Sequence, residues 1–118
     1  MLAKSERLKS RHIFNVVFKK NKKISSGLFT LYFLTSKDIN KLPKVAFVAP
    51  VRLDKRANKR NLVKRRMRVA YRLVKKVLSN ISYLIWIANP RTKNATFLEI
   101  KDTMNNLLEK LEQRVKPL

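Results

Sequence analysis

The stretch from Lys59 to Arg72, KRNLVKRRMRVAYR, decides the fold class and narrows the function. Seven of its fourteen residues are Lys or Arg, and none is acidic. Its apolar residues nevertheless recur at helical spacing, which predicts a helix from about Asn58 to Leu78 with one apolar stripe. We expect that stripe to pack on a sheet while the basic side chains stay in water. The stripe consists of Val63, Met67, Ala70, Tyr71, Val74, Val77 and Leu78.

The other side of this predicted helix is a row of positive charges that folding alone does not explain. Between Lys55 and Lys76 the sequence has eleven basic residues and no acidic one. Like charges four residues apart oppose helix formation by about 0.2–0.5 kcal/mol per pair. Arginine can offset this cost by binding a phosphate through two parallel hydrogen bonds. A solvated charged face usually mixes both signs, so we favour an anion-binding surface.

Composition agrees with a polyanionic partner. The chain has 118 residues, which predicts a single domain spanning 1–118. It carries 29 Lys and Arg against 7 Asp and Glu, a net charge of +22, which points to nucleic acid or an anionic membrane surface. The absence of cysteine excludes disulfides, thiolate metal sites and a Cys nucleophile. There is no apolar run of about 20 residues and no signal segment, so we expect a cytoplasmic protein.

Helices and strands alternate along the rest of the chain, which predicts a two-layer α/β (α+β) sandwich with a mixed sheet packed by helices. Ser10 can cap a helix that runs to about Lys20. Thr96 and Glu99 have the spacing of a capping box at the start of the last helix. Pro50 cannot donate a hydrogen bond, so its strand should end there, bulge, or lie at an edge. The predicted strands are Leu28–Leu34, Val45–Val51 and Ser82–Ala88, and the predicted polar loops lie around 36–42 and 91–94.

A search for catalytic residues finds almost nothing. His12 is the only histidine, which excludes a histidine pair or a His-based metal site and favours a surface or capping role. No Gly-rich phosphate loop is present, and the acids are too scattered for a paired-carboxylate site. Asp54 is the one acid near the basic helix, and we interpret it as a cap or a local counter-charge. We therefore predict no catalytic residue and no metal ligand in this chain.

At the basic helix the sequence resembles a known family. The stretch Arg60–Arg68, RNLVKRRMR, is similar to the RNR signature of the protein subunit of bacterial ribonuclease P. IFNVVFKKNKKISSGLFTLYF, from Ile13 to Phe33, is similar to that family's first helix and first strand in spacing. An apolar third strand, a proline and a last amphipathic helix complete a resemblance over nearly the whole chain.

The resemblance implies a fold and a function. The family's α/β sandwich contains a left-handed parallel crossover, although such crossovers are nearly always right-handed. In this family the RNA subunit is the catalyst, and it hydrolyses one phosphodiester of precursor tRNA with magnesium to leave the mature 5′ end. The protein binds that RNA and the 5′ leader of the substrate. The implied role is an accessory subunit of an endoribonuclease, with Mg²⁺ bound mainly by RNA and with neither DNA nor a membrane as partner.

The resemblance also implies two sets of binding residues. The contacts with the RNA subunit are Lys59, Arg60, Asn61, Lys64, Arg65, Arg68 and Arg72. The cleft for the leader is lined by Phe14, Phe18, Tyr32, Val48 and Pro50, and leader phosphates are held by Arg7, Arg11 and Arg52. Alternation along the first strand supports a shared face, because Phe29, Leu31 and Phe33 point one way and Thr30 and Tyr32 the other. From spacing alone, Phe14 and Phe18 would instead be core residues of an amphipathic helix.

The chain also departs from the family pattern, and two other functions stay open. The family commonly has Gly near Lys55, Val near Asn58, a basic residue at Leu62 and Glu or Gln at Val69. Its Ser-Val-Ser-Lys-Lys stands where this chain has Ala-Pro-Val-Arg-Leu at 49–53. A ribosomal or general RNA-binding protein would share the charge and the α/β layers without requiring the Arg-Asn register. A self-sufficient nuclease toxin would need a catalytic constellation that the sequence lacks.

Overall fold

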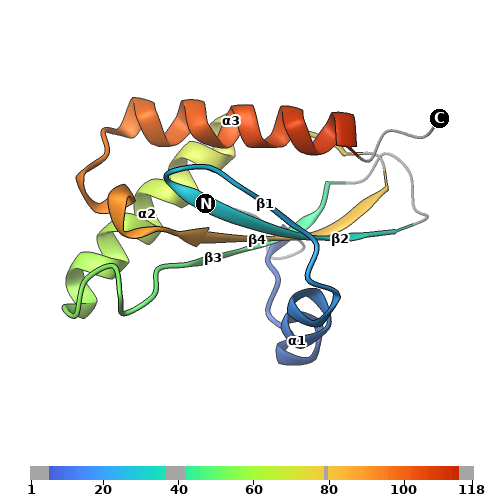
Figure 1. Ribbon diagram of the computed structural model, residues 1–118, viewed down its shortest axis with the longest axis horizontal. Helices are drawn as coiled ribbons and strands as arrows, with labels where there is room; N and C mark the ends of the chain where they lie inside the picture. The colour runs from blue at the N-terminus through green and yellow to red at the C-terminus, as the bar shows by residue number, and fades with distance from the viewer. Residues whose placement is uncertain (1–5, 37–41, 79, 115–118) are drawn as a thin grey trace.

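The computed structural model describes residues 6–36, 42–78 and 80–114, arranged as one mixed sheet between helices (Figure 1). Two helices cover one face of the sheet and the first helix lies on the other face. The predicted α+β class with a mixed sheet is thus confirmed, and α1 adds a layer opposite the other two helices. The elements are α1 (Arg11–Lys20), β1 (Lys23–Ser25), β2 (Phe29–Thr35), β3 (Lys44–Val48), α2 (Ala57–Val74), β4 (Ile81–Ala88), the 3₁₀ helix η2 (Pro90–Asn94) and α3 (Phe97–Arg114).

The sheet has the order β1-β2-β4-β3, with β3 at one edge. Strand β2 pairs antiparallel with both β1 and β4, whereas β3 pairs parallel with β4. Helix α2 is the crossover between these two parallel strands, as the family resemblance implies. The basic helix is therefore held beside an edge strand, where its outer side is not enclosed by a further strand.

The two faces of the sheet differ in burial. Phe29, Leu31 and Phe33 are almost completely buried under α2 and α3, while Thr30 and Tyr32 are half-buried on the other face. This confirms the predicted alternation. On the helix-covered face, Tyr71 packs edge-on against Trp86 with ring centroids 6.0 Å apart, and burial raises the pKa of its hydroxyl well above the ordinary value. The main core therefore lies between the sheet, α2 and α3.

Helix caps agree with the sequence. The Ser10 hydroxyl accepts a hydrogen bond from the backbone N–H of Ile13 at 3.3 Å, which fixes the start of α1. Thr96 and Glu99 form the predicted capping box, because each side chain accepts a hydrogen bond of 3.1 Å from the other residue's backbone N–H. The same interactions lower the pKa of Glu99. Both helices therefore begin where the sequence indicates.

Several predicted boundaries were wrong. Helix α2 ends at Val74, so Val77 is not part of the buried stripe and is 47% exposed, although Leu78 is buried. The second predicted strand ends at Val48, before Pro50, whose carbonyl accepts a turn hydrogen bond from Leu53. Strand β1 was missed, and the predicted loop at 91–94 is part of η2. In the other predicted loop, positions 37–41 lie outside the described residues.

Asp54 fixes the loop that leads into α2. Its buried carboxylate accepts hydrogen bonds from the backbone N–H, Nε and Nη2 of Arg56 at 2.9, 3.2 and 3.0 Å. Lys93 of η2 lies 3.0 Å from the same carboxylate. The hydrogen bonds from Arg56, and then that from Lys93, hold the pKa of Asp54 far below its usual range. Asp54 is the local counter-charge that the sequence predicted, and it ties this loop to η2.

We expect a negative charge on the buried side of α2 to destabilise the fold, and the same charge on its outer side to have little effect on stability. Met67→Asp places an unpaired carboxylate at a fully buried position, so the variant should be largely unfolded at 25 °C. Leu73→Asp introduces the same charge into the same helix at a position that is 64% exposed, and should melt close to wild type. Circular dichroism during thermal melting measures both. Similar melting temperatures for the two variants would contradict the assignment of the core face.

Asp54→Asn should lower stability in a pH-dependent way. The pKa of this carboxyl is lower in the folded protein than the unfolded value of about 3.9, so its ion pairs stabilise fully above about pH 5. This contribution is lost as the pH falls through the folded pKa. Wild type should therefore melt above the variant at pH 7, with the gap closing toward about pH 2. Asp102→Asn, at an exposed carboxylate of α3, is the matched control, and a gap independent of pH would contradict the role of the Asp54 charge.

Candidate nucleic-acid interface

The basic face of α2 is turned away from the core. Val63, Met67, Ala70 and Tyr71 are buried, while the cations between them are exposed or half-buried. We call the exposed set Arg65, Arg68 and Arg72 the arginine ridge. No acid occurs anywhere in α2, so the arginine ridge has no counter-charge within its own helix. Such an array of guanidinium groups is suited to bind phosphates.

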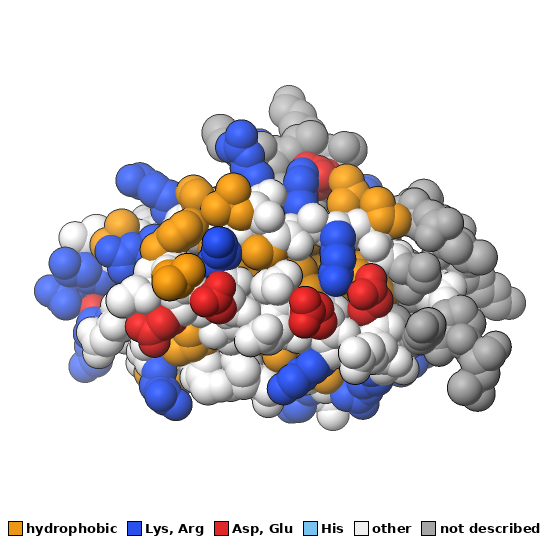
Figure 2. Space-filling model, turned by 90° about the horizontal axis from the view of Figure 1, so that it is seen from above, with side chains coloured by type: hydrophobic (Ala, Val, Ile, Leu, Met, Phe, Trp, Pro, Cys, Tyr) orange, Lys and Arg blue, Asp and Glu red, His pale blue; other side chains and the backbone are white. Residues whose placement is uncertain are grey.

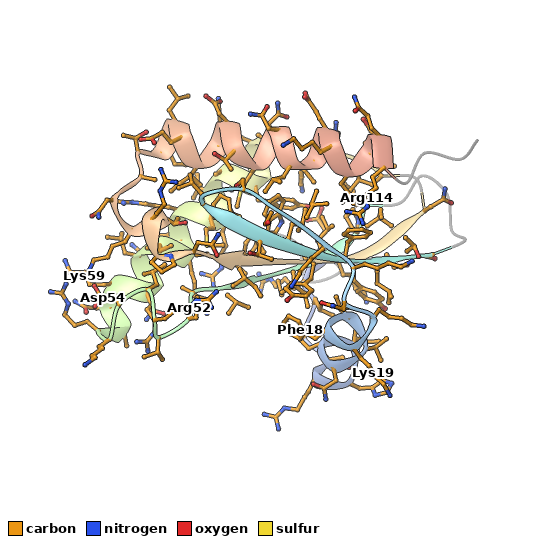
Figure 3. All side chains as sticks on the ribbon, in the orientation of Figure 1. Phe18, Lys19, Arg52, Asp54, Lys59 and Arg114 are labelled. Carbon is orange, nitrogen blue, oxygen red and sulfur yellow. The ribbon has the colours of Figure 1, made fainter. Side chains whose placement is uncertain are left out.

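The predicted RNA contacts at the start of α2 differ from one another in exposure and in hydrogen bonding. Arg60 donates from Nη1 to the carbonyl oxygens of Asp54 and Lys55, both at 2.9 Å, so its guanidinium also braces the loop before the helix. Asn61 is exposed, and Lys59 and Lys64 are half-buried. Figure 3 shows Lys59, Asp54 and Arg52 at the end of the molecule where α2 begins.

An aromatic cluster lies on the opposite face of the sheet, where α1 covers only part of the strands. It consists of Phe14, Phe18 and Tyr32. The rings of Phe14 and Phe18 are 6.3 Å apart, and Phe18 meets Tyr32 edge-on at 4.9 Å. Lys23 places its Nζ 5.4 Å from the centre of the Tyr32 ring. Phe18 is 38% exposed, so the cluster packs against the sheet and also presents apolar ring surface to solvent.

The N-terminal segment closes the edge of the sheet beside α2. Arg7 forms a parallel bridge with Val45, and the backbone N–H of Leu8 donates to the Val45 carbonyl at 2.9 Å. Glu6 forms an ion pair with Lys75 just after α2, at 2.8 Å. The segment is thereby fixed both to β3 and to the end of the basic helix.

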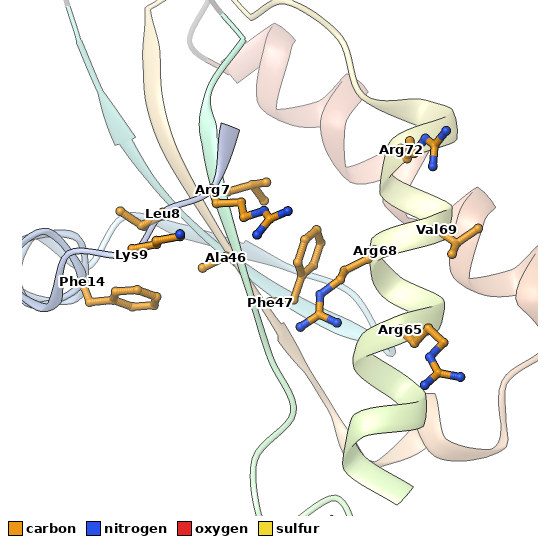
Figure 4. A pocket seen from close by; sticks show the side chains of 11 residues that line it. Arg7, Leu8, Lys9, Phe14, Ala46, Phe47, Arg65, Arg68, Val69 and Arg72 are labelled. Carbon is orange, nitrogen blue, oxygen red and sulfur yellow. The ribbon is translucent and has the colours of Figure 1, made fainter. Parts of the chain in front are cut away.

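A groove of about 730 Å³ runs between this segment, β3 and α2 (Figure 4). It brings Arg7 and Phe14 of the predicted leader set together with Arg65, Arg68 and Arg72 of the predicted RNA-subunit set. Its remaining lining residues were not predicted from the sequence as binding residues. The full lining is Arg7, Leu8, Lys9, Phe14, Val45, Ala46, Phe47, Arg65, Arg68, Val69 and Arg72.

Other predicted leader contacts lie outside this groove. Val48 is half-buried on the sheet face of the aromatic cluster, and Pro50 follows the end of β3. Arg11 is exposed at the first position of α1, and Arg52 is exposed in the turn after β3. These four residues border the sheet face or its ends. Lys9, Lys23 and Phe47 were not predicted as site residues, and Val69 was noted in the sequence only as a departure from the family pattern.

The surface that includes α3 differs in charge from the basic face of α2. Figure 2 shows the side formed by the helix layer, where acidic side chains alternate with basic and apolar ones. Four of the seven acids belong to α3: Glu99, Asp102, Glu109 and Glu112. Positive charge without acidic residues in the same helix is therefore a property of α2 and not of α3.

The described residues include few potential metal ligands that lie close together. Within 6–36, 42–78 and 80–114, no three acidic or histidine side chains come close enough to hold a metal ion. His12 is exposed on α1, and Asp54 is already bound by Arg56 and Lys93. No helix in the same part of the chain is both long and apolar enough to cross a membrane.

Comparisons with known proteins converge on one family. The family model described as Ribonuclease P matches residues 2–112. The ribonuclease P protein component of Phytoplasma australiense is 28% identical over 104 residues, covering 88% of this chain and 89% of that protein. The RNase P protein of Staphylococcus aureus has the same fold, with a TM-score of 0.76, 24% identity, and 92% and 97% of the two chains covered. That of Thermotoga maritima gives a TM-score of 0.70 at 20% identity, with 95% and 99% covered.

Proposed function

The chain belongs to the bacterial ribonuclease P protein family, and from this premise we propose that it binds the catalytic RNA subunit of ribonuclease P and the 5′ leader of precursor tRNA. In the complex, RNA performs the endonucleolytic step that releases the leader and leaves the mature 5′ end. The observation that carries the proposal is the acid-free basic face of α2 beside an aromatic, partly open sheet.

The arginine ridge is suited to the RNA subunit. Its three guanidinium groups lie on one side of a rigid helix, and each can bind a phosphate with two hydrogen bonds. Because the helix is anchored through buried Met67 and Tyr71, the spacing of the helix positions that carry the three arginines is fixed before binding. Such preorganisation lowers the entropy that binding has to remove.

The aromatic cluster is suited to a single-stranded leader. Bases stack on aromatic rings with little regard for sequence, and nearby cations hold the phosphates. Phe18 and Tyr32 offer the rings, Lys23 supplies charge beside Tyr32, and Arg11 is exposed at the start of α1. A leader can therefore be bound without base-specific hydrogen bonds.

Magnesium would be held mainly by RNA, since the described residues supply no cluster of ligands that fits it. The ion supplies charge stabilisation for phosphodiester hydrolysis when bound. This chain's own residues position the two RNAs and offset their mutual repulsion. We expect the protein to act in the cytoplasm.

Reconstitution tests the function directly. Precursor tRNA with a long leader is incubated in magnesium with the protein alone, with a bacterial ribonuclease P RNA alone, and with both. We expect leader removal to be faster with both components at low magnesium, and no cleavage with the protein alone. Equal rates with and without the protein would favour a general RNA-binding protein, and cleavage by the protein alone would indicate an independent nuclease.

Removing charge from the arginine ridge should weaken assembly. Arg65→Ala combined with Arg68→Ala leaves the buried stripe intact, so the fold should survive. Binding to the RNA subunit should weaken, and excess variant should partly restore activity. The log–log salt dependence of binding should become shallower by about 0.7–0.9 for each phosphate that the variant no longer neutralises. Lys110→Ala on α3 is the matched control, and wild-type binding by the double variant would contradict the assignment of the ridge.

Tyr32→Ala should affect the leader alone. Each stacked base contributes on the order of 1–3 kcal/mol, so the holoenzyme should lose affinity for precursor tRNA with a leader of several nucleotides. Affinity for mature tRNA and for the RNA subunit should stay near wild type. Phe14→Ala and Phe18→Ala should act likewise if those rings bind the leader.

The ratio of the affinity for precursor tRNA to the affinity for mature tRNA separates a loss of leader binding from simple destabilisation of the fold. If Phe14 and Phe18 act only as core residues, their variants should lose several kcal/mol of stability, and both affinities should fall together. Thermal melting of each variant identifies that case. An unchanged ratio in all three variants would refute the leader site at the aromatic cluster.

A further inference from the structure

We propose that the groove between β3 and α2 binds one nucleotide of single-stranded RNA, with its base against Phe47 and its phosphates at the arginine ridge. This inference rests on the proposed function, because it assumes that the chain binds ribonuclease P RNA or the leader. It adds Phe47 and the space beside it to the two proposed contact surfaces, because the groove shares the arginine ridge with the first surface and Phe14 with the second.

Phe47 is a fixed aromatic platform in this groove. Its ring packs edge-on against Tyr71 with centroids 5.7 Å apart, and Tyr71 in turn packs against Trp86 of the core. The side chain is thus anchored to the core at the same time as it lines the groove. Figure 4 shows it between Arg7 of the N-terminal segment and Arg68 of α2. A ring held in this way loses little entropy when a base stacks on it.

The charge of the groove selects an anionic ligand. Five cations line it, three from the arginine ridge together with Arg7 and Lys9, and none of its lining residues in the described chain is acidic. A neutral apolar ligand would not complement the positive charge of this lining. A second copy of this chain is disfavoured because each copy carries a net charge of +22.

The shape and chemistry of the groove favour a nucleotide over an acidic protein segment. A nucleotide combines a planar apolar face with phosphate oxygens, which matches an aromatic ring flanked by guanidinium groups. The volume of about 730 Å³ lies within the range of about 300–1,000 Å³ that is typical of small-ligand sites. It is therefore large enough for one nucleotide with its adjoining phosphates.

The nucleotide can come from either of two RNAs. Phe14 belongs to the aromatic cluster and also lines the groove, so a leader on the sheet face has a path to this site. The arginine ridge lines the opposite wall, so an unpaired nucleotide of the RNA subunit can reach the site as well. Both sources offer the same chemistry, and binding measurements can distinguish them.

Phe47→Leu removes the ring and keeps most of the apolar volume. We expect about a tenfold loss of affinity with an unchanged salt slope, because base stacking is removed while every cation remains. Phe97→Leu, the same change at a partly exposed ring of α3 outside the groove, should have no effect. Loss in binding to the free RNA subunit assigns the nucleotide to that RNA. Loss only for leader-bearing precursor, with mature tRNA unaffected, assigns it to the leader.

A fluorescent reporter gives a second measurement that does not depend on the size of the affinity change. Phe47→Trp places an indole in the groove, and wild type provides the background from buried Trp86. Titration with the RNA subunit, and then with precursor tRNA, should quench the new emission through base stacking. Equal quenching by poly-glutamate at the same ionic strength would overturn the nucleotide and assign the groove to an acidic protein segment.

The outcomes separate this proposal from the function on which it rests. If wild type neither binds the RNA subunit nor accelerates leader removal, the proposed function fails, and the groove proposal fails with it. If wild type does both, while Phe47→Leu binds all three RNAs normally and Phe47→Trp is not quenched, only the groove proposal is overturned. Melting temperatures of both variants near wild type confirm that folded protein is being compared.

Discussion

The fold depends on one helix that must bury one side in the core while its other side carries unneutralised positive charge. In α2, Met67, Ala70 and Tyr71 are buried, and the cations between them repel one another without an acid in the helix. Local helix propensity cannot hold such a segment, because like-charged pairs oppose it. Burial against the sheet and α3 supplies the stability, and the buried Asp54 carboxylate fixes the loop where no side chain caps the helix.

The alternation of side chains along β2 gives the two faces of the sheet different degrees of burial. On the face under α2 and α3, Phe29 and Phe33 complete a closed core. On the other face, α1 is too short to cover all four strands, and Tyr32 stays partly open beside Phe18. Phe14 and Phe18 therefore pack against the sheet and also present rings to solvent. Spacing alone could not resolve whether these two rings are buried or exposed, and in the folded chain each is partly buried and partly exposed.

The sequence predicted those features that depend on residues close together in the chain, and missed those that depend on contacts between distant segments. The starts of α1 and α3 were predictable because Ser10 and Thr96 cap helices through residues three positions away. Strand β1 was missed because it has three residues and exists by pairing with β2. The groove was missed because it requires the N-terminal segment to bridge to Val45, far along the chain, which no local pattern encodes. The residue types of the arginine ridge and of the aromatic cluster were recognisable, but the meeting of Phe14 with the arginine ridge in one groove required the fold.

Arg60, a residue that the sequence predicted as an RNA contact, also has a structural role. Its guanidinium holds the carbonyls of the loop before α2, and the same loop carries the counter-charge Asp54. The helix start and the arginine ridge are therefore fixed as one unit. The groove extends this unit, since the ridge forms one wall and Phe14 of the aromatic cluster reaches another. Two RNA strands that approach there would repel each other strongly, and a row of cations between them is the physical means of holding both. In the function that we propose, the charge of the chain serves to place two polyanions side by side, which neither surface could do alone.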